Sequence, residues 1–161
     1  MITFEKSFDE LEAGERFTTP ERTIGEADIM GFAALTGDNH PQHTDAEWAE
    51  GSRFGERIAH GLLVLSCAAG LVPFDPERVV ALRKLGDAVF KAPVLIGDTV
   101  HVEGEVSRTR ELDDEHGLVE CRWKVLNQHG KVVLRLTVEV VWRRGGPARG
   151  PEQSSAEPVL L

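Results

Sequence analysis

HGLLVLSCAAGL, residues 60–71, is the stretch that decides the fold, because every position after His60 is apolar or glycine except Ser66. Its length suits a short helix and falls well below the roughly 20 apolar residues that a membrane-spanning helix needs. A helix that is apolar on all sides must be enclosed by other parts of the structure. We therefore expect a central, buried helix.

The elements that would enclose this helix follow it in the chain. Apolar residues alternate with polar ones in three segments, which is the period of half-buried β-strands. Turn-rich stretches, Glu111–Gly117 and Asn127–Gly130, separate these segments as they do in antiparallel hairpins. Further strands are expected near Leu85–Ala92 and Arg16–Thr19. The pattern predicts an α+β fold in which an antiparallel sheet wraps one buried helix. The alternating apolar residues are Val100, Val102 and Val106, then Val119, Cys121, Trp123 and Val125, then Leu134, Leu136, Val138, Val140 and Trp142.

On the N-terminal side, residues 24–35 have apolar positions near helical spacing, and Gly37 follows them. This predicts a short amphipathic helix. The loop TGDNHPQHTD, Thr36–Asp45, comes next and holds two carboxylates, two histidines and a proline. Residues 46–49 are expected to form a helical turn that Asp45 caps.

The loop carries the chemistry. Pro41 fixes its own φ and biases His40 toward an extended conformation, so the loop can fold back and bring Asp38 and His43 together. A carboxylate and an imidazole that share a water molecule can add that water across a double bond. Gly61, at the start of the apolar helix, offers a backbone N–H that can stabilise an oxyanion.

Simpler interpretations of the same residues stay open. Asp38 can be an ordinary loop or capping carboxylate, and His43 a buried histidine with satisfied hydrogen bonds. A metal site could use Asp38, His40, His43 and Asp45. The proline constrains how the two histidines converge, so we expect no metal and no cofactor.

Composition limits the partners and the compartment. Lys and Arg total 18 against 27 Asp and Glu, a net charge of −9, so neither nucleic acid nor an anionic membrane surface is an expected partner. The first residues lack a signal-peptide pattern, which predicts a cytoplasmic protein. Cys67 and Cys121 are expected to be small buried side chains. We expect one domain over residues 1–144 and a disordered tail over residues 145–161, which are rich in Gly, Pro and polar residues.

Two stretches resemble a known family. TGDNHPQHTDAEWAEGSRFGERIAHGLL resembles the hydratase signature of the MaoC-like (R)-specific enoyl-CoA hydratases and dehydratases, which adopt the hot-dog fold. LGDAVFKAPVLIGDTVHVEGEVSRTRE is similar to the second half of that family's pattern, and the resemblance covers about Phe17–Trp142. Two positions depart from it: His40 stands where many members have Asn, and Ala69 where some carry a hydroxyl residue.

The resemblance implies a hydro-lyase that interconverts a 2-enoyl-CoA and an (R)-3-hydroxyacyl-CoA without a cofactor. Asp38 and His43 would hold the water, and the Gly61 N–H would bind the thioester carbonyl of an acyl-CoA or acyl-carrier-protein substrate. A homodimer or higher homo-oligomer with sheets joined edge to edge is also implied. Rival functions are a non-catalytic acyl-thioester-binding subunit and an acyl-CoA thioesterase. The residues that we expect to bind substrate are His60, Arg57, Lys91, Leu62 and Ala69.

Overall fold

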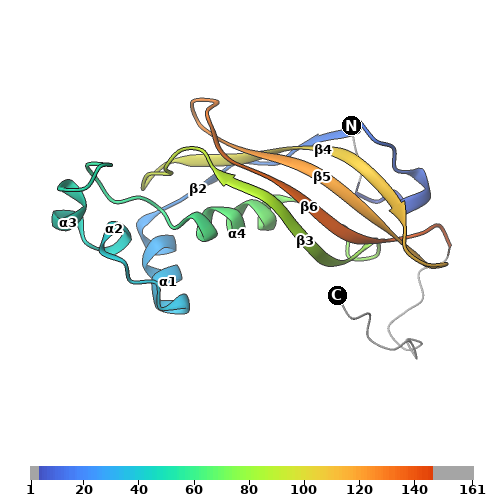
Figure 1. Ribbon diagram of the computed structural model, residues 1–161, viewed down its shortest axis with the longest axis horizontal. Coiled ribbons are helices and arrows are strands. Elements are labelled where there is room, and N and C mark those ends of the chain that lie inside the picture. The colour runs from blue at the N-terminus through green and yellow to red at the C-terminus, as the bar shows by residue number, and fades with distance from the viewer. Residues whose placement is uncertain (1–3, 147–161) are drawn as a thin grey trace.

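The computed structural model describes residues 4–146, which form an antiparallel sheet packed on one helix, with further helices at one end (Figure 1). Within these residues the sheet has six strands in the order β1-β4-β5-β6-β3, and β2 pairs beside β1 with β4. All of the pairings are antiparallel, so the predicted α+β class is confirmed. The helices are η1 (Phe8–Glu10, 3₁₀), α1 (Glu26–Thr36), α2 (Pro41–Thr44), α3 (Ala46–Glu50) and α4 (Gly61–Leu71), and the strands are β1 (Arg16–Thr18), β2 (Arg22–Thr23), β3 (Val79–Phe90), β4 (Thr99–Glu111), β5 (His116–Asn127) and β6 (Val132–Arg143).

The core lies between α4 and the inner face of the sheet. The three alternating segments became β4, β5 and β6, and each apolar position predicted to face inward is buried. Helix α4 meets them with Leu63, Val64, Cys67 and Ala68. Burying one large apolar side chain stabilises a fold by about 1.5–3 kcal/mol, so this contact holds the domain together.

Helix α4 is buried on one side only, which corrects the expectation that it is enclosed all round. Leu62 is 63% exposed, and Ser66, Ala69 and Gly70 are exposed as well. The sheet curves over one face of the helix, and within residues 4–146 no element covers the other. The adjoining edge strand β3 also presents apolar side chains to solvent: Val80, Leu82, Leu85, Val89 and Phe90.

Helices α1, α2 and α3 gather beyond the N-terminal end of α4 (Figure 1). Helix α1 begins after Gly25 and ends before Gly37, whose backbone has a left-handed conformation. It buries Ile29 and Ala33. Its predicted apolar positions Met30 and Leu35 are instead 42% and 83% exposed. Asp45 caps α3 as expected, because its carboxylate accepts a hydrogen bond from Trp48 N.

Some boundaries differ from the sequence prediction. Strand β3 begins at Val79, earlier than expected, and two short elements, α2 and β2, were not foreseen. The expected tail lies outside the described residues except for Gly145 and Gly146. Within the described residues, no helix is both long and apolar enough to cross a membrane.

Candidate active site at the start of helix α4

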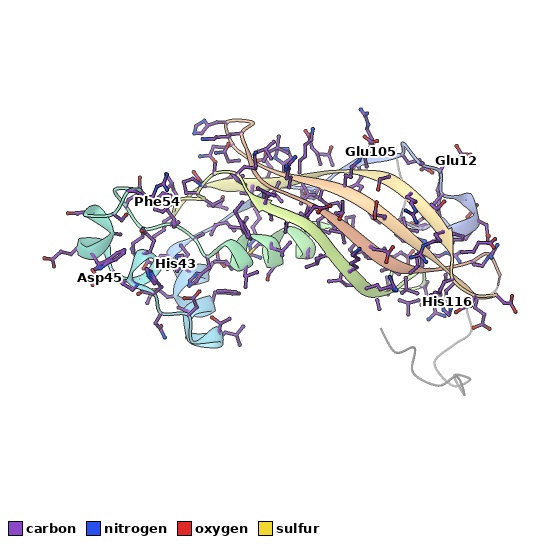
Figure 2. All side chains as sticks on the ribbon, in the orientation of Figure 1. Glu12, His43, Asp45, Phe54, Glu105 and His116 are labelled. Atoms are coloured by element: carbon purple, nitrogen blue, oxygen red, sulfur yellow. The ribbon has the colours of Figure 1, made fainter. Side chains whose placement is uncertain are left out.

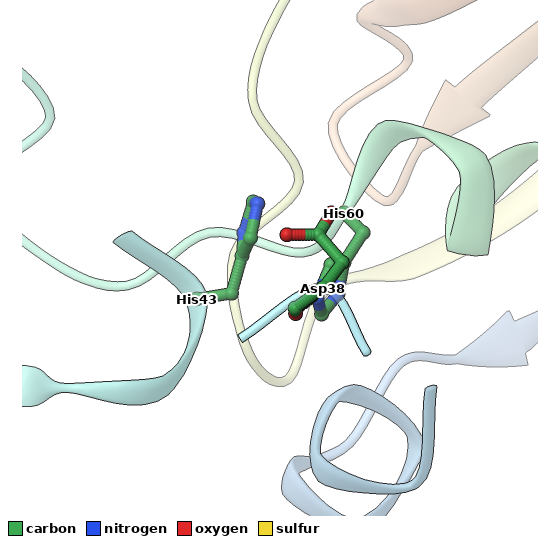
Figure 3. Close-up of side chains that lie close together, drawn as sticks. All are labelled: Asp38, His43 and His60. Atoms are coloured by element: carbon green, nitrogen blue, oxygen red, sulfur yellow. Dashed lines mark hydrogen bonds between the residues drawn. The ribbon is translucent and has the colours of Figure 1, made fainter. Parts of the chain in front are cut away.

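Three side chains from separate elements converge at the N-terminal end of α4 (Figure 3). Asp38 lies in the loop after α1, His43 in α2, and His60 at the N-cap of α4. One atom of each side chain, a ring nitrogen or a carboxylate oxygen, lies within 4.8 Å of the corresponding atoms of the other two. The structure thus brings together the aspartate and histidine predicted as a pair and adds a second imidazole.

The hydrogen bonds fix which nitrogen of His43 can act as a base. Its Nδ1 lies 2.7 Å from the carbonyl oxygen of Ile58. A carbonyl only accepts, so Nδ1 carries the hydrogen and Nε2 of the neutral ring keeps its lone pair. Burial lowers the pKa of His43, and the bond to Ile58, which acts in the opposite direction, does not cancel this effect. The ring is therefore a neutral, oriented proton acceptor.

His60 is part of the framework and not of a surface that substrate could reach. It is 2% exposed, and its Nε2 lies 2.9 Å from the backbone carbonyl of Asp38. Its ring stacks on His43 at 3.9 Å between centroids, with 28° between the ring planes. It does not line the pocket described below, so its predicted role in substrate binding has no support in the geometry.

The metal set considered from the sequence is not assembled. Asp45 is engaged in capping α3, and His40 in capping α2, where its Nδ1 accepts a hydrogen bond from Gln42 N at 3.1 Å. Asp38, His43 and His60 could in principle ligate an ion. The lone pairs of stacked imidazoles lie in nearly parallel planes, however, and do not converge on one point. This arrangement favours acid–base chemistry over metal binding.

His40 shows how this chain accommodates its departure from the family's asparagine. An N-cap side chain must accept a hydrogen bond from a backbone N–H of the first helical turn, and asparagine does so with its amide oxygen. Nδ1 of His40 takes that place in α2. An imidazole nitrogen thus supplies the acceptor for the cap of α2 in this chain.

Gln42, which the sequence analysis missed, ties the loop to the segment before α4. It is buried, and its side-chain Nε2 donates to the backbone carbonyl of Glu56 at 3.0 Å. Its backbone carbonyl accepts a hydrogen bond from Ile58 N at 3.2 Å. These bonds hold α2 against the strand-like segment that supplies the Ile58 carbonyl to His43. A polar residue beside Pro41 gave no sign of this role, because the partners lie 14 and 16 residues away.

A pocket of about 510 Å³ opens beside His43 and Gly61. The first N–H groups of a helix, here including that of Gly61, lack an intrahelical partner. No side chain caps the start of α4. A Cβ at residue 61 would lie only 2.7 Å from the Phe90 ring, so that ring would have to move if residue 61 carried a side chain. The other residues lining the pocket are Arg53, Phe54, Ile58, Ala59, Leu62, Val64, Phe90, Lys91, Ala92, Pro93, Val94 and Val133.

The basic residues that line the pocket differ from those predicted to bind substrate. Both terminal nitrogens of Arg57 bind the Glu26 carboxylate, at 2.8 and 2.5 Å, and Arg57 does not line the pocket. Arg53 and Lys91 are exposed and do line it. Of the predicted apolar contacts, Leu62 borders the pocket and Ala69 does not. Phe54, a pocket residue absent from the prediction, lies near His43 at the same end of the molecule (Figure 2).

Comparison with known proteins agrees with this arrangement. A family model described as "MaoC like domain" matches residues 9–128. Protein MaoC of Klebsiella aerogenes is 43% identical over 100 residues, which are 62% of this chain and 30% of that protein. The (R)-specific enoyl-CoA hydratase of Aeromonas caviae is 34% identical over 105 residues, which are 65% of this chain and 78% of that enzyme. The chain thus spans under a third of the first of these relatives.

Solved structures extend the match to the architecture. A MaoC-like dehydratase from Rhodospirillum rubrum superposes with a TM-score of 0.79 at 28% identity, covering 88% of this chain and 99% of that one. A double-hot-dog protein of Mycobacterium tuberculosis, at 19% identity, shares the fold with a TM-score of 0.79, covering 92% of this chain and 47% of that one. The family model covers most of the described residues, and both solved structures share the architecture of this chain. The chain therefore belongs to the MaoC-like domain family and has the hot-dog fold.

Proposed function

We propose that this chain is a hydro-lyase that interconverts a 2-enoyl thioester and an (R)-3-hydroxyacyl thioester. The observation that carries the proposal is the neutral, partly buried imidazole of His43, which lines the pocket and has a ring nitrogen within 4.8 Å of an Asp38 carboxylate oxygen. The A. caviae relative named as an (R)-specific enoyl-CoA hydratase supports the same reaction and its stereochemistry.

In the hydration direction, Nε2 of His43 takes a proton from the water, and the oxygen attacks C3 of the enoyl group. The Asp38 carboxylate accepts a hydrogen bond from the other hydrogen of the water and orients it. The proton then passes from His43 to C2 on the same side, so that one water is added and His43 returns to its neutral form. Dehydration follows the same steps in reverse.

Negative charge develops on the thioester oxygen when C3 is attacked, and the proposal assigns its stabilisation to the Gly61 N–H. The start of α4 favours negative charge because its N–H groups are unpaired and its dipole is positive there. Gly61 lies in the same pocket as His43, as this role requires.

Arg53 and Lys91 take the place of the predicted Arg57 and Lys91 pair in this proposal. Both line the pocket and are exposed, so their charges are placed to meet the phosphates of a CoA or carrier-protein pantetheine arm. Arg57 has a structural partner in Glu26.

We also propose that the working form is a homodimer. Leu62 and Phe90 border the pocket and also belong to the exposed apolar surface formed by α4 and β3. A second protomer covering that surface would bury apolar side chains and pair the free edge of β3. It would also form a wall of the pocket.

The test is loss of enoyl-thioester absorbance with crotonyl-CoA and a longer enoyl-CoA, for the parent, Asp38→Asn and His43→Gln. Each variant is expected to lose about 10²–10⁴-fold in rate, the usual contribution of a general acid or base. Far-ultraviolet circular dichroism checks that the fold is kept, and His129→Gln, in the exposed β5–β6 turn, is the matched control.

Two results would support the rivals instead. Release of free CoA without a hydroxyacyl product would identify a thioesterase. Tight binding of acyl-CoA without turnover by the parent would identify a binding subunit. Chiral analysis of the 3-hydroxyacyl product checks the (R) configuration.

A further inference from the structure

His60 contacts residues of α1, α2 and the loop between them that are far from it in the sequence. Its ring lies between Phe32 of α1, at 5.0 Å between centroids, and His43 of α2, at 3.9 Å. Its own backbone carbonyl accepts a hydrogen bond from Val64 N as α4 begins. The imidazole of His60 thus contacts α1 and α2, while the backbone of the same residue begins α4.

Hydrogen bonding restricts His60 to one state. Because Nε2 donates to the Asp38 carbonyl, Nε2 carries the hydrogen and Nδ1 keeps a lone pair. In the described part of the chain, Nδ1 is buried without a hydrogen-bond partner. In the neutral ring the hydrogen is therefore on Nε2, and the buried Nδ1 has no hydrogen to donate.

We propose that His60 is the positioning residue that sets the Asp38 carboxylate and the His43 imidazole at working distance from each other. Its N–H holds the backbone of Asp38, and its ring face holds the ring of His43, so one side chain controls both members of the pair. The kinetic consequence of this proposal rests on the proposed hydratase function, whereas the structural role of His60 does not.

The two contacts can be separated by substitution. His60→Phe keeps a flat ring to stack on His43 and loses the donor to Asp38. His60→Gln keeps an N–H donor and loses the ring. Displacing a catalytic group by about 1 Å typically costs on the order of 10²-fold in rate. Each variant is expected to lose about that much in kcat with KM nearly unchanged, because His60 does not line the pocket.

The pH profile is a readout that a purely structural role would not move. The titratable side chains facing His43 are Asp38 from the loop, His40 from its own turn and His60 from α4. Burial is the largest cause of the lowered pKa of His43, and the stacked His60 ring covers one face of it. His60→Gln removes that ring and exposes His43 to water, so the acid limb of kcat should move to higher pH in this variant and not in the His129→Gln control.

The deciding experiment combines these kinetics with nitrogen-15 NMR of the histidine rings. In the parent we expect His43 in its Nδ1–H form and His60 in its Nε2–H form at neutral pH, and in both variants altered His43 signals. A parent spectrum with His60 in its Nδ1–H form overturns the proposal, even if neither variant folds. Unchanged kcat and His43 signals, or a rise in KM alone, also overturn it. A parent without hydratase activity refutes the proposed function instead, and the NMR result still decides the role of His60.

Discussion

At the scale of single residues, the decisive feature is the protonation state of His43. Its ring donates from Nδ1 to Ile58 and is partly buried, and burial lowers its pKa below the ordinary value of about 6.5. A base works only while it is unprotonated, so a lowered pKa lets His43 accept a proton in more acidic solution. Burial sets the direction of this shift, and the bond to the Ile58 carbonyl opposes it without cancelling it.

We expect the acid limb of kcat/KM to have its midpoint below about pH 6.5, the value for an unperturbed histidine. Measuring hydration rates across pH, under conditions where the chemical step limits the rate, checks this. A midpoint above that value would show that His43 is stabilised as the cation, and the assignment of a neutral base would be wrong. His129→Gln should reproduce the parent profile.

Gly61→Ala is predicted to affect catalysis more than stability. An added Cβ would meet the Phe90 ring at 2.7 Å, but that ring is half-exposed and can rotate away. Alanine also suits a helix better than glycine, so the melting temperature should change little. The methyl group would occupy the approach to the Gly61 N–H and reduce kcat/KM by about 10²-fold or more. A large fall in melting temperature would contradict this prediction.

Which residues could be predicted from sequence depends on where their partners lie. Asp38 and His43 share one short loop, so local reasoning about Pro41 was enough to place them together. The roles of His60 and Arg57 depend on contacts formed only in the folded chain, with the Asp38 carbonyl and with Glu26. Sequence placed both in the substrate site, and the structure gives both a supporting place.

At the scale of elements, regular alternation made β4, β5 and β6 predictable, whereas β3 was found only in part. Strand β3 is an edge strand whose two faces are both largely exposed, so its sequence shows no simple alternation. Its pairing with β6 is also interrupted by register shifts, one of them between Gly86 and Val89, where Asp87 has a positive φ of 48°. Such irregularities break the period-two signal.

The burial of α4 illustrates a different limit. Composition predicted apolar neighbours on all sides of this helix, whereas the described residues cover only one of its faces. The exposed faces of α4 and β3 adjoin at the pocket, through Leu62 and Phe90. A helix predicted to be fully enclosed but found half-exposed is therefore itself an argument for a second protomer.

Leu82→Glu is predicted to shift the protein from dimer to monomer. Leu82 is 52% exposed on β3, opposite Val140 of β6, and lies on the surface that we propose to be covered. A carboxylate there would have to be desolvated in the interface, whereas in a monomer it stays in water. Light scattering after size exclusion measures the mass, and Arg108→Glu, exposed on β4, is a control away from β3. An unchanged dimer would exclude this surface as the interface.

At the scale of the whole molecule, the site is assembled from parts far apart in the chain. Helix α2, the segment before α4 and the end of β3 each supply one wall, and Gln42 of α2 joins the first two. Only the end of β3 belongs to the sheet, and the segment before α4 continues directly into that helix. The stability of the core and the geometry of the site should therefore be lost together.

The two cysteines can test whether α4 and the sheet unfold as one unit. Cys67 lies on α4 and Cys121 on β5, and both are buried. Burial raises the pKa of Cys67 and raises that of Cys121 to about 12, so neither thiol forms the reactive thiolate readily in the native state. In a urea series, both should become reactive toward iodoacetamide at the midpoint where the sheet signal in circular dichroism is lost. Mass spectrometry of the two cysteine peptides measures each reaction separately. Alkylation of Cys67 well below that midpoint would mean that α4 can leave the sheet before the sheet unfolds, and the single cooperative domain expected from the sequence would have to be divided.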